Sequence, residues 1–286
     1  MSTSSAIAAT ATAAAPIGIF DSGLGGLSVL RAARAQLPDE SFVYVADSHH
    51  APYGPRDEAF ITERTLAIGE WLAREGAKAL VIACNTATAR AIAAIRERLP
   101  MPLVGVEPGI KPAAAVSASG IAGVLATQST LNSPRFQALL ERYGAGRRFI
   151  CQPGHGLVEA IERGDTNSPA LRALLDSYLQ PMLDDGADTL VLGCTHYPFF
   201  TDTIRDLVGD RLTIVDTSDA IARQLMRVLD EHRLRAPAST HAAPPRFCST
   251  GDGLPLQALA STLLGLDAPV ESVTISSPNA HARAAA

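Results

Sequence analysis

The feature that most constrains the fold is a buried strand followed at once by a cysteine, which occurs twice in the chain. KALVIACNTATA (78–89) and DTLVLGCTHYPF (188–199) share this form, with small hydroxylated or amide residues after the cysteine. Two further pairs of upstream segments match each other: 17–23 with 122–130, and 42–48 with 149–155. A duplicated α/β unit is the simplest interpretation. Chance similarity is the alternative, because short apolar strands resemble one another.

Short apolar runs alternate with longer amphipathic stretches from Pro16 to about Ile275. The early runs are continuous, as expected for strands covered on both faces: 17–20, 42–46, 79–83, 103–106, 123–127, 149–152, 189–193 and 212–216. Helical patterns lie between them, for example from Asp57, a candidate N-cap, to Arg74. Two late runs, 246–250 and 270–275, flank a helical segment at 254–264. This order predicts parallel sheets with helices on both sides.

The duplication predicts an α/β fold of two similar parallel-sheet domains, related by pseudo-two-fold symmetry, with an active site in the cleft between them. The first domain would comprise residues 16–107 and 217–277, and the second residues 108–216. Residues 1–15 and 278–286 are small and Ala-rich, without the basic start and apolar middle of a secretory signal. We expect both ends to be disordered tails.

Composition narrows the class of partner. The formal net charge of -5 gives no basic field for a nucleic acid backbone. No apolar run reaches the ~18–20 residues needed to cross a bilayer, so no membrane association is expected. The four cysteines, in a chain without an export signal, favour free thiols and a cytoplasmic location. A small-molecule ligand is the partner that remains.

Ligands of parallel α/β sheets bind outside the carboxyl ends of the strands. The polar residues expected there are Asp21, Ser22, Asp47, Ser48, Cys84, Asn85, Thr86, Glu107, Thr127, Cys194, Thr195 and His196. Cys84 and Cys194 would each precede a helix, whose N-terminal dipole should lower the pKa of the thiol. Cys151 and Cys248 lack this context and are expected in the core.

Two thiols on opposite sides of a cleft suit a racemase, which must remove a proton from one face of a carbon and return one to the other. Structural zinc is the alternative use of cysteines, but the chain has no Cys-x-x-Cys, and we expect no metal. A pyridoxal cofactor would need a lysine. The only lysines are Lys78, at the wrong end of a strand, and Lys111, without a pyridoxal motif, so we expect no cofactor.

Two loops could contact a ligand. GIFDSGLGGLSVL (18–30) lacks both the Lys-Ser/Thr of a nucleotide-binding loop and the G-x-G-x-x-G spacing. Its glycines are expected to let the backbone of Asp21 and Ser22 approach a small carboxylate. HAPYG (50–54) is a turn in which the Tyr53 hydroxyl and the Gly54 amide are available donors; an ordinary loop is the alternative.

The segments IGIFDSGLGGLSVL, YVADSHHAPYG, VIACNTATA, VGVEPGI and VLGCTHYP, in this order, resemble the bacterial glutamate racemases of the aspartate/glutamate racemase superfamily. The resemblance runs from about Ile17 to Ser277. It implies a cofactor-independent enzyme that interconverts L- and D-glutamate with two cysteine bases and supplies D-glutamate for peptidoglycan. Dimers are common in the family, so a homodimer is also implied.

Residue roles follow from the same resemblance. Cys84 would exchange the proton with D-glutamate and Cys194 with L-glutamate, assisted by Asp21, His196 and Glu159. The implied substrate-binding residues are Asp21, Ser22, Tyr53, Gly54, Asn85, Thr86, Thr130, Thr195 and His196.

Two segments depart from the family pattern. His49-His50 is not the usual pair before PYG, and CQPGHGLVEAI (151–161) is a looser match, which bears on Glu159 and the side-chain pocket. An aspartate or hydantoin racemase or a maleate isomerase is the alternative within the superfamily; the DSGLGG, PYG and CTHYP segments favour glutamate. Some glutamate racemases also inhibit DNA gyrase. A separate interaction role of that kind would need an ordered extension or a charged run, and the short Ala-rich ends offer neither.

Overall fold

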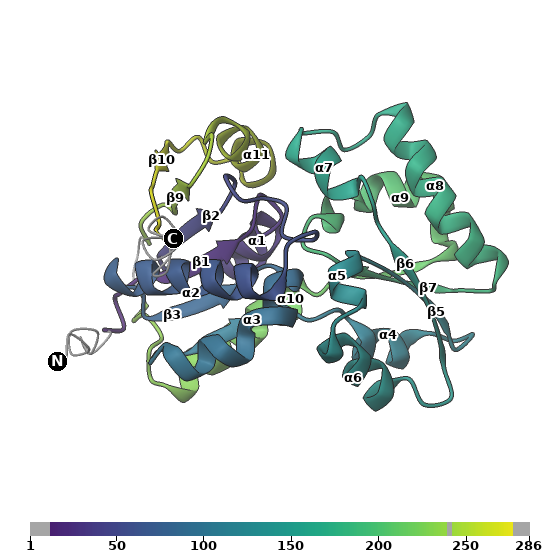
Figure 1. Cartoon of the computed structure of the whole chain (residues 1–286), viewed down its shortest axis with the longest axis horizontal. Helices are drawn as coiled ribbons and strands as arrows, with labels where there is room; N and C mark the ends of the chain where they lie inside the picture. The colour runs from purple at the N-terminus through teal and green to yellow at the C-terminus, as the bar shows by residue number, and fades with distance from the viewer. Residues whose placement is uncertain (1–11, 239–241, 277–286) are drawn as a thin grey trace, which may run out of the picture.

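The computed structural model describes residues 12–238 and 242–276. Its ten strands form two separate, wholly parallel sheets, side by side in Figure 1. The six-stranded sheet has the order β10-β9-β2-β1-β3-β4 and the four-stranded sheet the order β6-β5-β7-β8. We call each sheet with its helices the first lobe and the second lobe.

The first lobe is built from both ends of the described chain. Its strands are β1 (Ile17–Asp21), β2 (Phe42–Ala46), β3 (Ala79–Ile82), β4 (Leu103–Gly105), β9 (Arg246–Ser249) and β10 (Val270–Ser272). Its helices are α1 (Leu27–Gln36), α2 (Glu58–Arg74), α3 (Asn85–Arg98), α10 (Ser218–Glu231) and α11 (Leu254–Leu264). The side chains of β1 and β3 enter one apolar core with α1 and α10 and another with α2 and α3, so this sheet is covered on both faces as predicted.

The second lobe is one continuous segment. Its strands are β5 (Ile121–Ala126), β6 (Arg148–Pro153), β7 (Thr189–Gly193) and β8 (Thr213–Val215). Its helices are α4 (Ile110–Val116), α5 (Gln128–Leu131), α6 (Pro134–Tyr143), α7 (Leu157–Glu162), α8 (Pro169–Asp184) and α9 (Thr201–Val208), with 3-10 turns η1 (Tyr197–Phe200) and η2 (Gly209–Arg211).

The two sheets repeat one topology. The order β6-β5-β7-β8 reproduces β2-β1-β3-β4, so each predicted pair of matching segments occupies equivalent strands. The predicted α/β fold with two parallel sheets is confirmed, and the apolar runs locate the strands to within about two residues. The boundaries at 107/108 and 216/217 stay predictions.

The predicted tail 278–286 and residues 1–11 of the other predicted tail lie outside the described residues. Residues 12–15, which are described, form a turn closed by a bond from the Ala15 amide to the Thr12 carbonyl. The buried Lys78 ammonium donates to the Ala13 carbonyl and pairs with the buried Glu40 carboxylate. This end of the described chain is therefore bound to the base of the first sheet.

The cysteine predicted in the core at position 151 is exposed, whereas Cys248 is buried as expected. Cys151 lies on β6, which is the edge strand of its sheet and is only partly covered. An apolar run does not by itself distinguish an edge strand from a central one.

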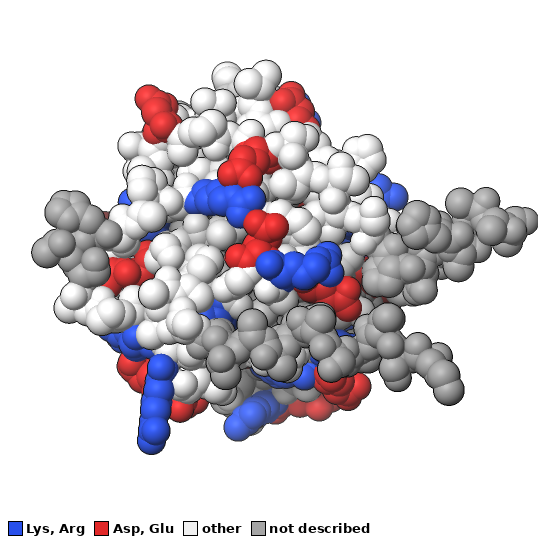
Figure 2. Space-filling model, turned by 90° about the vertical axis from the view of Figure 1, so that its left-hand side faces the viewer, with Lys and Arg blue, Asp and Glu red and all other residues white. Residues whose placement is uncertain are grey.

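The surface carries mixed charge. Among the described residues on the face shown in Figure 2, basic and acidic side chains are interspersed, and neither sign forms a continuous patch. Within the described ranges, none of the helices combines the length and apolar character needed to cross a membrane.

Candidate active site

A cavity of about 440 Å³ lies where the carboxyl ends of the strands in both sheets meet. Most of the predicted site residues line it: Ser22, Tyr53, Gly54, Cys84, Asn85, Thr86, Glu159, Cys194, Thr195 and His196. Cys84 follows β3 and Cys194 follows β7, which are equivalent strands of the repeat. The duplication therefore brings two thiols to one cavity from opposite lobes.

Cys84 is the N-cap of α3, and its Sγ accepts from the Ala87 amide at 3.4 Å. The Ser22 hydroxyl lies 3.4 Å from the same sulfur. Burial and the neighbouring Asp21 charge raise the pKa of the Cys84 thiol to about 12. The expectation of a lowered pKa was therefore wrong for Cys84, because desolvation of the thiolate outweighs the helix N-terminus.

Asp21 ends β1 and lies beneath the cavity wall rather than in it, with no exposed surface. Its Oδ1 accepts from the Gly23 amide at 2.7 Å, and its Oδ2 accepts from the Thr195 hydroxyl at 3.2 Å. Burial raises the pKa of Asp21 to about 6, although His196 acts to lower it. A buried acid with a pKa near neutrality is suited to exchanging protons.

The second thiol, that of Cys194, is the first group in a series of polar contacts. Cys194 Sγ lies 3.6 Å from His196 Nδ1, and His196 Nε2 lies 2.7 Å from Glu162 Oε1. Burial acts to lower the pKa of His196, but its contacts with Cys194 and Glu162 raise it well above the usual value. The protonated ring donates to Glu162 from Nε2 and points Nδ1–H at the sulfur.

The carboxylate that bonds His196 is that of Glu162, which the sequence did not single out, and the role of Glu159 as an assisting acid stays a prediction. Both are on α7, one turn apart, and Glu159 lines the cavity without a hydrogen bond to His196 among the described contacts. Sequence reasoning missed Glu162, although its spacing of three residues from Glu159 puts it on the same side of the helix.

Two glycines of the β1–α1 loop lie against side chains of the second lobe. A Cβ on Gly23 would lie 2.1 Å from Glu162 Oε1, and a Cβ on Gly25 would lie 2.3 Å from His196 Nδ1. Glu162 Oε1 also accepts from the Leu24 amide at 2.8 Å. The expectation that the loop lets the backbone of Asp21 and Ser22 approach a small carboxylate ligand stays a prediction.

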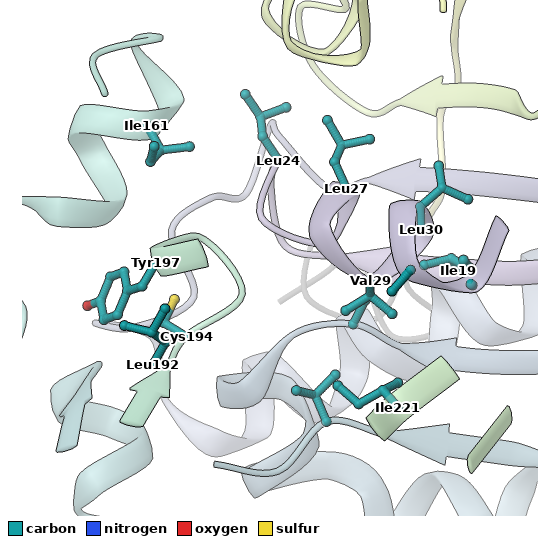
Figure 3. Close-up of a cluster of buried hydrophobic side chains, with 14 of the residues drawn as sticks. Ile19, Leu24, Leu27, Val29, Leu30, Ile161, Leu192, Cys194, Tyr197 and Ile221 are labelled. Atoms are coloured by element: carbon teal, nitrogen blue, oxygen red, sulfur yellow. The ribbon is translucent and has the colours of Figure 1, made fainter. Parts of the chain in front are cut away.

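Apolar packing continues across the same junction. Leu24 and Leu27 of the first lobe share one buried cluster with Ile161 and Tyr197 of the second (Figure 3). Polar bonds also cross the junction: the Ser28 hydroxyl donates to the Thr195 carbonyl at 3.0 Å. The Cys194 site therefore adjoins a packed apolar interface between the lobes, whereas Cys84 packs in a core of the first lobe.

The predicted substrate-binding residues separate into two groups. Asn85 and Thr86 begin α3 at the cavity wall, and among the described residues the buried Asn85 Nδ2 has no hydrogen-bond partner. Thr130 is fully buried and does not line the cavity. Thr127 takes that place, with its hydroxyl 3.0 Å from that of Thr86 and donating to that of Thr130 at 2.9 Å.

Tyr53 lines the cavity, but its hydroxyl is directed elsewhere. It donates to the buried Asp47 carboxylate at 2.6 Å. The expectation that this hydroxyl is available to a ligand was wrong, whereas Gly54 is at the wall with open space around its Cα.

Two arginines that sequence reasoning did not single out, Arg56 and Arg90, also line the cavity. Arg90 reaches from α3 to the Ser129 carbonyl of the second lobe at 3.3 Å, so it spans both lobes. The cavity thus combines hydroxyl, amide and cationic groups with two thiols, as a small anionic ligand would require.

Comparison with known proteins shows the family to which the chain belongs. Residues 27–225 match the family model for Asp/Glu/hydantoin racemases. The chain belongs to this family. It is an amino-acid racemase.

Individual relatives cover almost the whole chain. A glutamate racemase of Ralstonia nicotianae is 60% identical over 91% of this chain and 93% of its own length. The crystal structure of Escherichia coli glutamate racemase, in complex with L-glutamate and the activator UDP-MurNAc-Ala, has a TM-score of 0.81 at 32% identity and covers 92% of this chain and 99% of that one. Glutamate racemase from Francisella tularensis, in complex with D-glutamate, has a TM-score of 0.80 at 27% identity and covers 93% and 99%.

Proposed function

We propose that this chain interconverts L- and D-glutamate by a two-base mechanism in which Cys84 and Cys194 are the proton donor and acceptor. The observation that carries the proposal is the position of the two thiols after equivalent strands of a duplicated fold, at one cavity, each with its own acidic neighbour. Glutamate racemases similar to this chain over nearly its whole length support glutamate as the substrate.

From L-glutamate, the Cys194 thiolate removes the α-proton and the C–H electron pair remains on the substrate as a carbanion. The Cys84 thiol then delivers its proton to the opposite face, and the electron pair forms the new C–H bond of D-glutamate. The products of this half-cycle are a Cys194 thiol and a Cys84 thiolate. The reverse reaction restores the starting protonation.

The acidic neighbours differ between the two thiols. Asp21, with a pKa of about 6, lies close enough to Cys84 for its charge to raise the pKa of that thiol. His196, held by Glu162, places a ring nitrogen 3.6 Å from the Cys194 sulfur, where it can exchange a proton with the thiol. We assign Asp21 to the Cys84 side and the His196–Glu162 pair to the Cys194 side.

The weak acidity of the α-proton requires donors aimed at the substrate carboxylate, where negative charge develops. The unpartnered Asn85 Nδ2 and the first amides of α3 are such donors, with Ser22, Thr86, Thr195 and the Gly54 amide around them. We assign Thr127 rather than Thr130 to this group, because Thr127 reaches the cavity.

The test is incubation of the purified protein with D-glutamate in D₂O without pyridoxal phosphate. Circular dichroism follows the stereochemistry, and mass spectrometry follows deuterium at the α-carbon. We expect racemisation with deuterium uptake in the wild type and its loss in both Cys84→Ala and Cys194→Ala. Absence of exchange in the folded wild type would contradict the proposal, and aspartate and hydantoins would then be tried in the same assay.

As a glutamate racemase the protein would act in the cytoplasm and supply D-glutamate for peptidoglycan, and so for cell shape. The homodimer implied by the sequence resemblance stays a prediction. Size-exclusion chromatography with light scattering tests it directly.

A further inference from the structure

A second buried polar network lies beside the cavity, around the Asp47 carboxylate at the end of β2. Asp47 has no exposed surface, and Arg64 of α2 binds it with two bonds, from Nε at 3.0 Å and from Nη2 at 2.8 Å. The Thr250 hydroxyl donates to it at 2.8 Å, and His50 Nδ1 lies 3.1 Å away. Burial acts to raise the pKa of Asp47, but these bonds hold it well below its usual range, so the group is an anion.

The fourth residue that bonds this anion is Tyr53, whose hydroxyl donates to it at 2.6 Å. Tyr53 and its neighbours Pro52, Gly54, Pro55 and Arg56 are the part of the first lobe that forms one wall of the cavity. The Tyr53 ring is buried, and its centroid lies 6.1 Å from that of Phe20 and 6.3 Å from that of Phe60. Because the ring is enclosed, its hydroxyl is held pointing in one direction.

The loop has few other fixed points. The Asp47 and His49 amides attach the start of the loop to the lobe, donating to the Asp21 carbonyl at 3.0 Å and to the Thr250 hydroxyl at 3.3 Å. Beyond His49 its backbone bonds are a turn from the His50 amide to the Asp47 carbonyl and a turn from the Arg56 amide to the Tyr53 carbonyl, and both are local. The side chains that attach it to the lobe are His50 and Tyr53, and both bond the same carboxylate.

We propose that Asp47 and Tyr53 are positioning residues, which hold the Pro52–Arg56 wall at the distance that substrate binding requires. Asp47 is connected rigidly to the reactive centre, because its amide donates to the Asp21 carbonyl at 3.0 Å. Tyr53 therefore sets the place of the Gly54 amide relative to Cys84. The Tyr53 hydroxyl itself donates to the protein and not to the substrate. This inference rests on the proposed glutamate racemase activity for its kinetic readout.

The test is Tyr53→Phe, which removes one hydroxyl and leaves the ring. When the Pro52–Arg56 wall is no longer held in position, binding of the substrate and of the transition state weakens equally. The KM for glutamate should therefore rise by about 3- to 10-fold, while kcat stays within about twofold. Hydrogen–deuterium exchange of a peptide spanning residues 48–60 should become faster, because one of the two loop side chains that bond the Asp47 carboxylate no longer does so.

Thr203→Val is the matched control. The Thr203 hydroxyl is equally buried and donates to the Thr166 carbonyl at 2.7 Å, in the second lobe and away from the cavity lining. A role in general stability predicts similar effects for both variants. The proposal predicts that only Tyr53→Phe raises KM and speeds exchange of the loop.

An unchanged KM in Tyr53→Phe, or an equal rise in Thr203→Val, would overturn the inference. If the wild type itself racemises no glutamate, the proposed function fails, and the exchange measurement alone then decides the inference: faster exchange in Tyr53→Phe supports anchoring and unaltered exchange refutes it.

Discussion

Replacing Asp21 by Asn should make the fold more stable at neutral pH while reducing turnover. Asp21 has no exposed surface, and its pKa is about 6 instead of the 3.8 of an exposed aspartate. The folded state therefore opposes ionisation of this group. Asparagine keeps the shape and the acceptor for the Gly23 amide, but carries no charge.

The magnitude follows from the two pKa values. Their difference corresponds to about 3 kcal/mol, since each pKa unit is worth about 1.36 kcal/mol. A raised carboxyl pKa adds stability below 3.8, which is lost as the pH rises towards 6. The gain from Asp21→Asn should thus be about 1.5 kcal/mol at pH 5 and approach about 3 kcal/mol at pH 7 and above.

Urea unfolding followed by the fluorescence of Trp71, the single tryptophan, measures this gain at pH 5, 6, 7 and 8. Asp47→Asn is the control with the opposite sign. The pKa of Asp47 is lowered, and removing its charge breaks its buried ion pair with Arg64, which costs about 3–5 kcal/mol. A gain for Asp21→Asn that does not grow between pH 5 and 7, or a loss at pH 7, would refute the burial argument.

Three further substitutions test the remaining contacts. Glu162→Gln should lower kcat by about 10²-fold and Glu159→Gln by much less, because only Glu162 bonds the histidine beside Cys194; equal effects in a steady-state racemisation assay would reverse this assignment. Gly25→Ala should lower kcat and the melting temperature together, since its Cβ would lie 2.3 Å from that histidine's Nδ1, and overpacking costs about 1–3 kcal/mol; a fully active alanine variant would show that the lobes have room to separate. Lys78→Met should reduce the free energy of unfolding by about 3–5 kcal/mol, because it removes the cation that pairs with the buried Glu40 carboxylate; a chemical denaturation curve equal to that of the wild type would contradict this.

Strand positions could be predicted from the sequence because burial on both faces leaves a continuous apolar run. The run at 17–20 became β1 and the run at 189–193 became β7, with matching topology around each. The exception was Cys151 on β6, where the short run at 149–152 also predicted a strand but the strand is at a sheet edge. Edge position depends on strand order, which is a property of the whole lobe.

The two thiols could be located for the same reason, since each directly follows a predictable strand. Of their neighbours, Asp21 and His196 were expected from the sequence, but Glu162 was not. Choosing Glu162 over Glu159 depends on how α7 sits against the other lobe, and choosing Thr127 over Thr130 depends on which side of a single turn faces the cavity. The pKa of Cys84 was wrong in direction because burial is a tertiary quantity that the helix N-terminus does not determine.

The duplication and its divergence serve different requirements of a two-base reaction. Equivalent strands bring one thiol from each lobe, which provides two opposed groups without a special loop for either. The surroundings of the two thiols differ: burial favours the neutral form of Cys84, whereas the His196 ring lies 3.6 Å from the Cys194 sulfur. Under the proposed mechanism each thiol therefore has a different proton partner, and Asp21, bonded to Thr195 of the other lobe, lies where the two sides meet.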